Sequence, residues 1–229
     1  MRHFTRTCGV LTIVATAALF AAGRVAPSQA SALTHAMSRN TALLNVSNFG
    51  RMSTQVFHAD GDWTIQYSMS CKSGTTNFSI TTYQSDGTYG DLLENLITKR
   101  LSKTQYEHNS GDWYLVIDGD CPWRVKVTGS GRSASTRSPK GRTLLSVSGT
   151  GTMSTRTFTA KGNWAISYSM SCRGDTANFS IVSYKDNQYN ALLENLIVGR
   201  ISKTQFLHVG GKYYLKIDGS CPWRVTVKG

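Results

Sequence analysis

The sequence has no apolar run long enough to cross a bilayer. Its longest apolar stretch, Val10 through Ala22, has about a dozen residues, whereas a membrane-spanning helix needs about 20. The G-x-S-x-G, H-E-x-x-H and P-loop signatures are also missing, as is a paired-carboxylate motif. These absences argue against a membrane protein and against the common hydrolases and nucleotide-binding enzymes, so we expect a non-catalytic protein without a cofactor.

The first residues have the pattern of a secretory leader. Arg2 and Arg6 precede the apolar run, and the small-x-small motif that signal peptidase accepts follows at residues 30–32. The pattern predicts a signal peptide over 1–32 and an N-terminal extension over 33–42. No lipobox cysteine follows the apolar run, and no adjacent arginines precede it, so we expect export by the general secretory pathway to the extracellular space.

A tandem duplication occupies most of the remaining chain. Segment 43–129 matches segment 144–229 along its whole length, with more than half of the aligned positions identical, and LLENLI, SKTQ and CPWRV occur in both. A period near a hundred residues is too long for a solenoid, so each copy should be a self-contained domain. We expect one domain over 43–129 and another over 143–229, joined by a flexible Ser-, Gly- and Pro-rich linker over 130–142.

The cysteines behind the leader form an even set, which in an exported chain predicts disulfides. Four cysteines allow three pairings, and the duplication selects Cys71 with Cys121 and Cys172 with Cys221. Each bridge closes about fifty residues and is worth about 4 kcal/mol on the chain-entropy model. A structural zinc site would need close cysteine pairs such as Cys-x-x-Cys, which are missing here, so we expect no metal.

Within each copy the apolar residues alternate with polar ones, as in half-buried strands. Trp63, Ile65, Tyr67 and Met69 share one face, which should be buried, and glycines punctuate the apolar runs with turns. The pattern predicts an all-β protein of two antiparallel β-sandwich domains, jelly-roll or immunoglobulin-like in type. Residues 92–97, LLENLI, fit either a single helical turn or a covering loop.

Positive charge is concentrated in the linker and in the second copy. The whole chain has a net charge of +12, yet the first copy has seven basic and nine acidic residues. We expect a partner such as an anionic cell-wall polymer, a polysaccharide or a secreted protein rather than nucleic acid, and the alternative is a solvated basic surface. The linker residues that would take part are Arg132, Arg137, Lys140 and Arg142.

Side-chain parity separates aromatic residues of the core from those at the surface. Trp63 and Trp123 share a strand face with cysteines and aliphatic residues, so we place them in the core together with Trp164 and Trp223. Two tyrosines and two arginines should point the other way and form an exposed contact patch. These candidate binding residues are Tyr114, Arg124, Tyr214 and Arg224.

The motif W-x-I-x-Y-x-M-x-C, followed by Y-L-x-I-x-x-x-C-x-W-x-V, resembles small secreted disulfide-containing β-sandwich domains of Gram-positive, especially actinobacterial, bacteria. The resemblance covers both copies. It implies a fold and an extracellular compartment, and it carries no catalytic residues.

These features favour a secreted, non-catalytic binding or interaction module at the cell envelope or in the extracellular space. The alternative is a secreted enzyme or enzyme inhibitor that uses loops at one end of the sandwich. A cleft that gathers His108 or His208 with Asp and Tyr side chains would favour the alternative.

Overall fold

The computed structural model describes residues 41–134 and 141–229, and every regular element in these ranges is a β-strand. The predicted signal peptide, 1–32, and most of the predicted extension, 33–42, lie outside the described residues. Within the described ranges no helix has the length and apolar character needed to cross a membrane.

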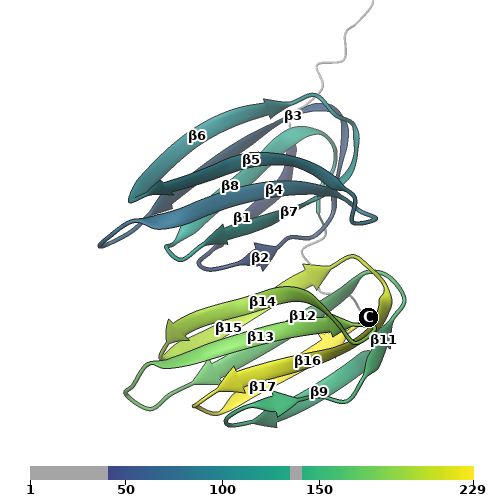
Figure 1. Cartoon of the computed structure of the whole chain (residues 1–229). Coiled ribbons are helices and arrows are strands. Elements are labelled where there is room, and N and C mark those ends of the chain that lie inside the picture. The colour runs from purple at the N-terminus through teal and green to yellow at the C-terminus, as the bar shows by residue number, and fades with distance from the viewer. Residues whose placement is uncertain (1–40, 135–140) are drawn as a thin grey trace, which may run out of the picture. The chain divides into compact units, whose positions relative to one another are not determined.

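Eight strands build the first repeat and form two layers (Figure 1). One layer has the order β1, β8, the second half of β3, and β6. In the other layer β7 pairs with β2, with the first residues of β3 and with β4, and β4 pairs with β5. The strands are β1 (Thr41–Asn48), β2 (Met52–Ser53), β3 (Phe57–Ser70), β4 (Thr76–Gln84), β5 (Tyr89–Thr98), β6 (Arg100–Glu107), β7 (Gly111–Gly119) and β8 (Trp123–Arg132).

The second repeat has the same order in two separate sheets. Strands β9, β17, β12 and β15 form one sheet, while the other consists of β10 and β11 beside β16, followed by β13 and β14. The strands are β9 (Thr143–Gly149), β10 (Met153–Ser154), β11 (Phe158–Ala160), β12 (Trp164–Ser171), β13 (Ala177–Lys185), β14 (Gln188–Val198), β15 (Arg200–Leu207), β16 (Gly211–Gly219) and β17 (Trp223–Lys228).

The pairing order distinguishes between the two predicted sandwich types. In the first repeat the first strand pairs with the last, β2 pairs with the strand before the last, and every pairing is antiparallel. Eight strands wound in this way, in two sheets, form a jelly roll rather than an immunoglobulin fold. The all-β fold class is therefore confirmed, with the jelly-roll form in both repeats.

The burial of β3 explains why this sequence forms a strand. Trp63, Ile65, Tyr67 and Met69 are each at most 3% exposed, and the residues between them are more open to solvent. Burying a large apolar side chain contributes about 1.5–3 kcal/mol, so the two-residue alternation fixes which face meets the core.

The disulfides confirm the predicted pairing. Cys71 is bonded to Cys121 with their Cα atoms 5.1 Å apart, and Cys172 is bonded to Cys221 at 5.2 Å. In the first repeat the bond joins the residue after β3 to the turn between β7 and β8. Each disulfide therefore links two chain segments covalently at one end of its β-sandwich.

The prediction of a helical turn or a loop at residues 92–97 is wrong, because this segment lies within β5 and its counterpart lies within β14. The register of β5 against β4 shifts between Ile80 and Thr81, so that Leu93 and Glu94 are both buried although they are consecutive. A bulge of this kind breaks the two-residue rhythm of a strand and produces spacing that resembles a helical face.

Strand β8 extends into the predicted linker 130–142. Gly131 and Arg132 pair with Ala59 and His58 of β3, so the strand ends at Arg132. In the first repeat β3 is continuous through both layers. In the second repeat the corresponding chain divides into β11 and β12 around Gly162, whose φ is 141°.

Candidate functional site: an arginine and serine face in each repeat

The outward side of the sheet formed by β1, β8, β3 and β6 carries two arginines among serines. We call this set of side chains the Arg–Ser face. An identical set lies on β9, β17, β12 and β15. The residues are Ser47, Ser68, Ser70, Arg100, Ser102 and Arg124 in the first repeat, and Ser148, Ser169, Ser171, Arg200, Ser202 and Arg224 in the second.

Strand register brings these side chains together. Arg124 lies between Ser47 and Ser68, and Ser68 is also directly opposite Ser102. Directly opposite residues in antiparallel strands point to the same side of the sheet. The neighbours of these residues along the strands, such as Met69 and Trp123, are buried on the other side.

The second repeat reproduces this register. Arg224 lies between Ser148 and Ser169, and Ser169 is opposite Ser202. Arg200 is opposite Ser171, as Arg100 is opposite Ser70. The two faces are therefore equivalent in residue type and in position on the sheet.

The paired outward positions of both sheets carry hydroxyl, amide, aromatic, basic and alanine side chains and no carboxylate, whereas Asp60 and Asp62 are exposed in an unpaired bulge of β3. In the first repeat Lys126 adds a third cation. It lies two residues after Arg124 on β8 and is paired with Asn45 on one side and Gln66 on the other. All four arginines of the two faces are exposed. None of their guanidinium groups forms an ion pair with a described residue.

A shallow hollow lies beside each face, with a volume of about 400 Å³ in the first repeat and about 490 Å³ in the second. The hollow in the first repeat is lined by Arg100, Arg124 and Pro122 together with serines of the face. A guanidinium group offers five donors in a planar fork, and a serine hydroxyl adds another, so the face can bind carboxylate, sulfate or phosphate oxygens.

A polar network that includes the buried Tyr67 and Glu94 and the more exposed Lys103 lies under the Arg–Ser face of the first repeat. Glu94 of β5 accepts a hydrogen bond from the Tyr67 hydroxyl at 2.9 Å and pairs with the Lys103 ammonium at 2.7 Å. The Gln105 amide donates to the Tyr67 hydroxyl at 2.7 Å and to the Leu93 carbonyl at 2.8 Å. Because Lys103 and Gln105 belong to β6, the network holds in place the strand that carries Arg100 and Ser102.

The same network recurs in the second repeat. The Tyr168 hydroxyl donates to Glu194 at 2.6 Å, the Lys203 ammonium pairs with Glu194 at 2.8 Å, and Gln205 donates to Tyr168 at 2.7 Å. Burial and the Glu194 carboxylate raise the pKa of Tyr168 well above its usual range. Both tyrosines therefore act as neutral donors that hold a carboxylate between the layers.

We expect the substitution Glu94→Gln to lower the free energy of unfolding of the first repeat by about 1–3 kcal/mol at neutral pH. Burial raises the pKa of Glu94, but hydrogen bonds from Lys103 and Tyr67 outweigh it and hold the pKa below its usual range. The ionised form therefore stabilises the fold above the ordinary carboxyl pKa, and this contribution is lost as the pH falls through the folded-state pKa. Urea unfolding at pH 7 and pH 3 measures the difference.

Glu107→Gln is the matched control for this prediction. Burial and the nearby Asp91 raise the pKa of Glu107, so its charge does not favour folding at neutral pH. This substitution should leave the stability at pH 7 unchanged or increase it. An equal loss of stability in both variants would contradict the role assigned to the network.

The structure divides the candidate binding residues between two layers. Arg124 and Arg224 belong to the Arg–Ser faces, whereas Tyr114 and Tyr214 lie on β7 and β16 in the opposite layers. These four residues therefore do not form the single patch that the sequence suggested, because parity predicts an outward direction without saying which sheet carries the residue.

The tyrosines instead form short aromatic rows. Tyr114 stacks on Tyr83 with ring centroids 5.3 Å apart and is 8% exposed, and Tyr214 stacks on Tyr184 at 4.8 Å. Burial, with smaller contributions from Tyr83 and Asp86, raises the pKa of Tyr114 to about 12. Tyr114 is therefore neutral at physiological pH.

The basic residues predicted in the linker have different positions. Arg132, at the end of β8, lies 3.7 Å from the Asp112 carboxylate, and Arg142 is exposed just before β9. Arg137 and Lys140 lie outside the described residues. Of this predicted set, only the Arg132 side chain has a described ion pair, while the Arg142 backbone carbonyl accepts a hydrogen bond from the Gly229 N–H at 3.1 Å.

Arg100, Arg200 and the serines of both faces were not predicted from the sequence. A usable signal was present, since S-M-S-C and the arginine two residues before SKTQ occur in both copies. Among the described residues no group of three or more His, Cys, Asp or Glu side chains could hold a metal ion.

No protein-family model matches the sequence, and the search of curated proteins finds no match. Among solved structures, the CBM22-1 and CBM22-2 tandem domain of Xyn10C from Paenibacillus barcinonensis is 8% identical, with 85% of this chain and 96% of that chain covered and a TM-score of 0.24. A protein of unknown function from Pseudomonas aeruginosa is 11% identical, with 80% and 77% covered and a TM-score of 0.23.

A third similar structure contains the M60 catalytic domain with the CBM51-1 and CBM51-2 domains of ZmpB from Clostridium perfringens. It is 9% identical, with 82% of this chain and 38% of that chain covered and a TM-score of 0.22. TM-scores this low assign neither a ligand nor a family to this chain.

Proposed function

We propose that the protein is an exported, non-catalytic binding module that holds an anionic polymer on the Arg–Ser faces of its two repeats. The observation that carries this proposal is the pair of guanidinium groups that have no ion pair with a described residue and lie among serines at paired positions without a carboxylate, an arrangement that occurs in both repeats. The two disulfides support export, because such bonds persist in oxidising compartments.

Duplication adds a physical reason for a polymeric partner. A polymer presents the same anionic group many times, so a chain with two equivalent faces can bind it at two points. Once one face is bound, the second binds at high effective concentration, and the overall affinity exceeds that of a single face by about 10²–10⁴. A small anion would gain nothing from the second copy.

The test is retention of the full chain on heparin-agarose, a sulfated polysaccharide matrix, and on purified cell wall. Retention should be strong at low salt, should fall steeply toward 1 M salt, where the Debye length is about 3 Å, and should be absent on unsubstituted agarose. Retention that does not change with ionic strength would refute the proposal.

The structure also contains the kind of cleft expected for the alternative function. His108, Asp91 and Tyr89 line one hollow at an end of the first repeat, as the enzyme or inhibitor alternative requires. However, the described contacts include no hydrogen bond among these three side chains, and His108 pairs instead with Asp62 at 3.2 Å. The side chains of this His108–Asp62 pair are 75% and 79% exposed, and no described hydrogen bond joins His108 to a nucleophile, so the cleft fits binding better than catalysis.

A further inference from the structure

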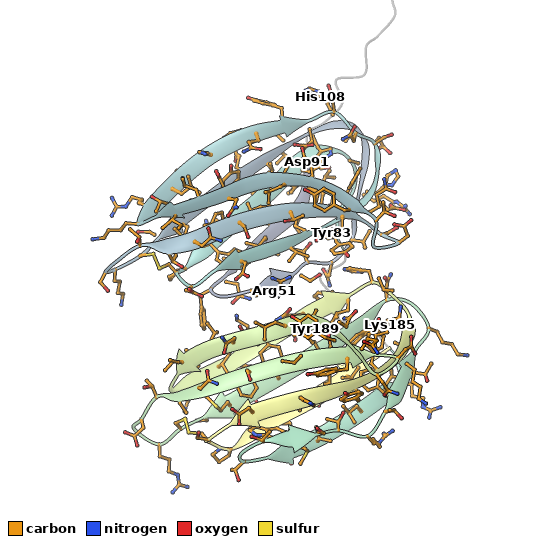
Figure 2. All side chains as sticks on the ribbon, viewed as in Figure 1. Arg51, Tyr83, Asp91, His108, Lys185 and Tyr189 are labelled. Atoms are coloured by element: carbon orange, nitrogen blue, oxygen red, sulfur yellow. A yellow bond between two sulfur atoms is a disulfide. The ribbon has the colours of Figure 1, made fainter. Side chains whose placement is uncertain are left out.

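The first repeat has an end cleft, with a volume of about 590 Å³, between its two layers. Its walls come from the facing ends of β3, β4, β5, β6 and β7 and from the turn between β6 and β7. Asp91 and His108, labelled in Figure 2, are two of its lining residues. A cavity of this size is in the range of small-molecule sites, about 300–1,000 Å³.

The cleft is acidic, although the whole chain is basic. Asp91 and Glu107 line it, and no Lys or Arg is among its lining residues, all of which lie in the described ranges. Burial and the Asp91 charge raise the pKa of Glu107, while His108 opposes this only in part. A cation bound here would relieve the repulsion between the two carboxylates.

Aromatic rings form the floor and the rim. Trp63 and Trp113 are 2% and 7% exposed at the floor, while Tyr89 is 58% exposed at the rim. The indole Nε1 of Trp113 is buried and has no hydrogen-bond partner among the described residues.

Gly90 keeps the cleft open. A Cβ atom at this position would lie 2.9 Å from Cζ3 of Trp113 and 2.5 Å from Oγ1 of Thr82, both on the cleft wall. The Thr82 hydroxyl already accepts a hydrogen bond from the Asp91 backbone N–H at 2.7 Å, which fixes the start of β5 beside the cleft. Glycine therefore lets Thr82 and Trp113 pack closely against the backbone of β5, and a larger residue would displace these parts of the cleft wall.

The second repeat has lost this site while keeping its Arg–Ser face. The positions of Gly90, Asp91, Glu107, Asn109 and Trp113 hold Asn190, Ala191, Leu207, Val209 and Tyr213. The Asn190 amide donates to the Ser183 hydroxyl at 3.0 Å, and the Tyr213 hydroxyl donates to the Val209 carbonyl at 2.9 Å. The polar side chains that replace Gly90 and Trp113 are thus hydrogen-bonded within the second repeat.

We propose that the end cleft of the first repeat is a second binding site, for an amino sugar whose free ammonium group lies between Asp91 and Glu107. An ammonium group satisfies the two carboxylates, and a cation near aromatic rings is favoured further by their quadrupoles. Thr82, Gln84, Asn109 and Ser110 add hydroxyl and amide groups to the lining, which match the hydroxyls of a sugar ring. A lysine side chain would leave most of these polar groups without partners.

The test is calorimetric titration of the full chain with a glucosamine tetramer and with the same tetramer fully N-acetylated. Acetylation removes the charge and keeps the sugar backbone. We expect the charged tetramer to bind at least tenfold more tightly than the acetylated one. Asp91→Ala and Glu107→Leu, which introduce the residues of the second repeat, should each weaken its binding at least tenfold.

Asp120→Ser is the matched control, since it also removes one exposed carboxylate and introduces the residue of the second repeat, Ser220, outside the cleft. It should change the affinity less than twofold, and thermal unfolding should show all three variants folded. If Glu107→Leu disturbs folding, Asp91→Ala alone decides the matter. Equal or tighter binding of the acetylated tetramer, binding of neither tetramer, unchanged binding by the cleft variants, or tighter binding of a tetralysine peptide would each overturn the inference.

Discussion

Replacing Arg100, Arg124, Arg200 and Arg224 together by glutamine is expected to abolish retention of the protein on heparin-agarose at physiological salt. These four guanidinium groups are exposed and unpaired among the described residues, so their removal takes away the cationic donors of both faces. Replacing the two arginines of one repeat should leave one intact face and lower the affinity by about 10²–10⁴, because the gain from two-point attachment is lost.

A matched control distinguishes binding by the Arg–Ser faces from binding that depends only on net charge. The variant Lys72→Gln, Lys161→Gln, Arg173→Gln and Lys212→Gln also removes four exposed positive charges, all outside the Arg–Ser faces. This control variant should still be retained strongly on heparin-agarose, because both Arg–Ser faces remain intact. If both quadruple variants elute at the same salt concentration, binding depends on net charge and the faces have no special role.

Removing the first disulfide by Cys71→Ser and Cys121→Ser is expected to lower the free energy of unfolding of the first repeat by about 4 kcal/mol. The bond closes a loop with a sequence separation of 50 residues, and a cross-link of that length removes much entropy from the unfolded chain. A loss of this size is a large part of the 5–15 kcal/mol that stabilises an ordinary domain.

Guanidinium unfolding followed by the fluorescence of the buried tryptophans measures the effect. The variant should show an early transition for the first repeat and a later one close to that of the intact protein. The matching variant Cys172→Ser and Cys221→Ser should reverse the roles of the repeats. If the free energy of unfolding changes by less than 1 kcal/mol in both variants, the stability of the repeats does not depend on their disulfides.

Alternation predicted the strands well where a strand is buried on one side only. Trp63 through Met69 of β3 follow the two-residue rhythm without interruption, so their inward direction could be predicted from the sequence. The winding into a jelly roll could not, because it depends on pairings between distant strands, such as β1 with β8, that leave no local signal.

The Arg–Ser faces escaped prediction for two reasons. The first repeat has more acidic than basic residues in total, and this sum conceals a set of paired outward positions that carry no carboxylate. In addition, residues 100–107 were not predicted to form a strand, so Arg100 was not placed on the same sheet as Arg124. Such sites depend on register, which local sequence does not specify.

The continuous β3 gives the first repeat a mechanical property that the second lacks. Residues 57–59 pair with β7 and residues 63–70 pair with β6, while His58, Ala59 and residues 63–69 also pair with β8, so separating the layers strains one stretch of backbone. In the second repeat the chain is interrupted between β11 and β12. Amide protons should therefore exchange with solvent in one cooperative event in the first repeat and layer by layer in the second.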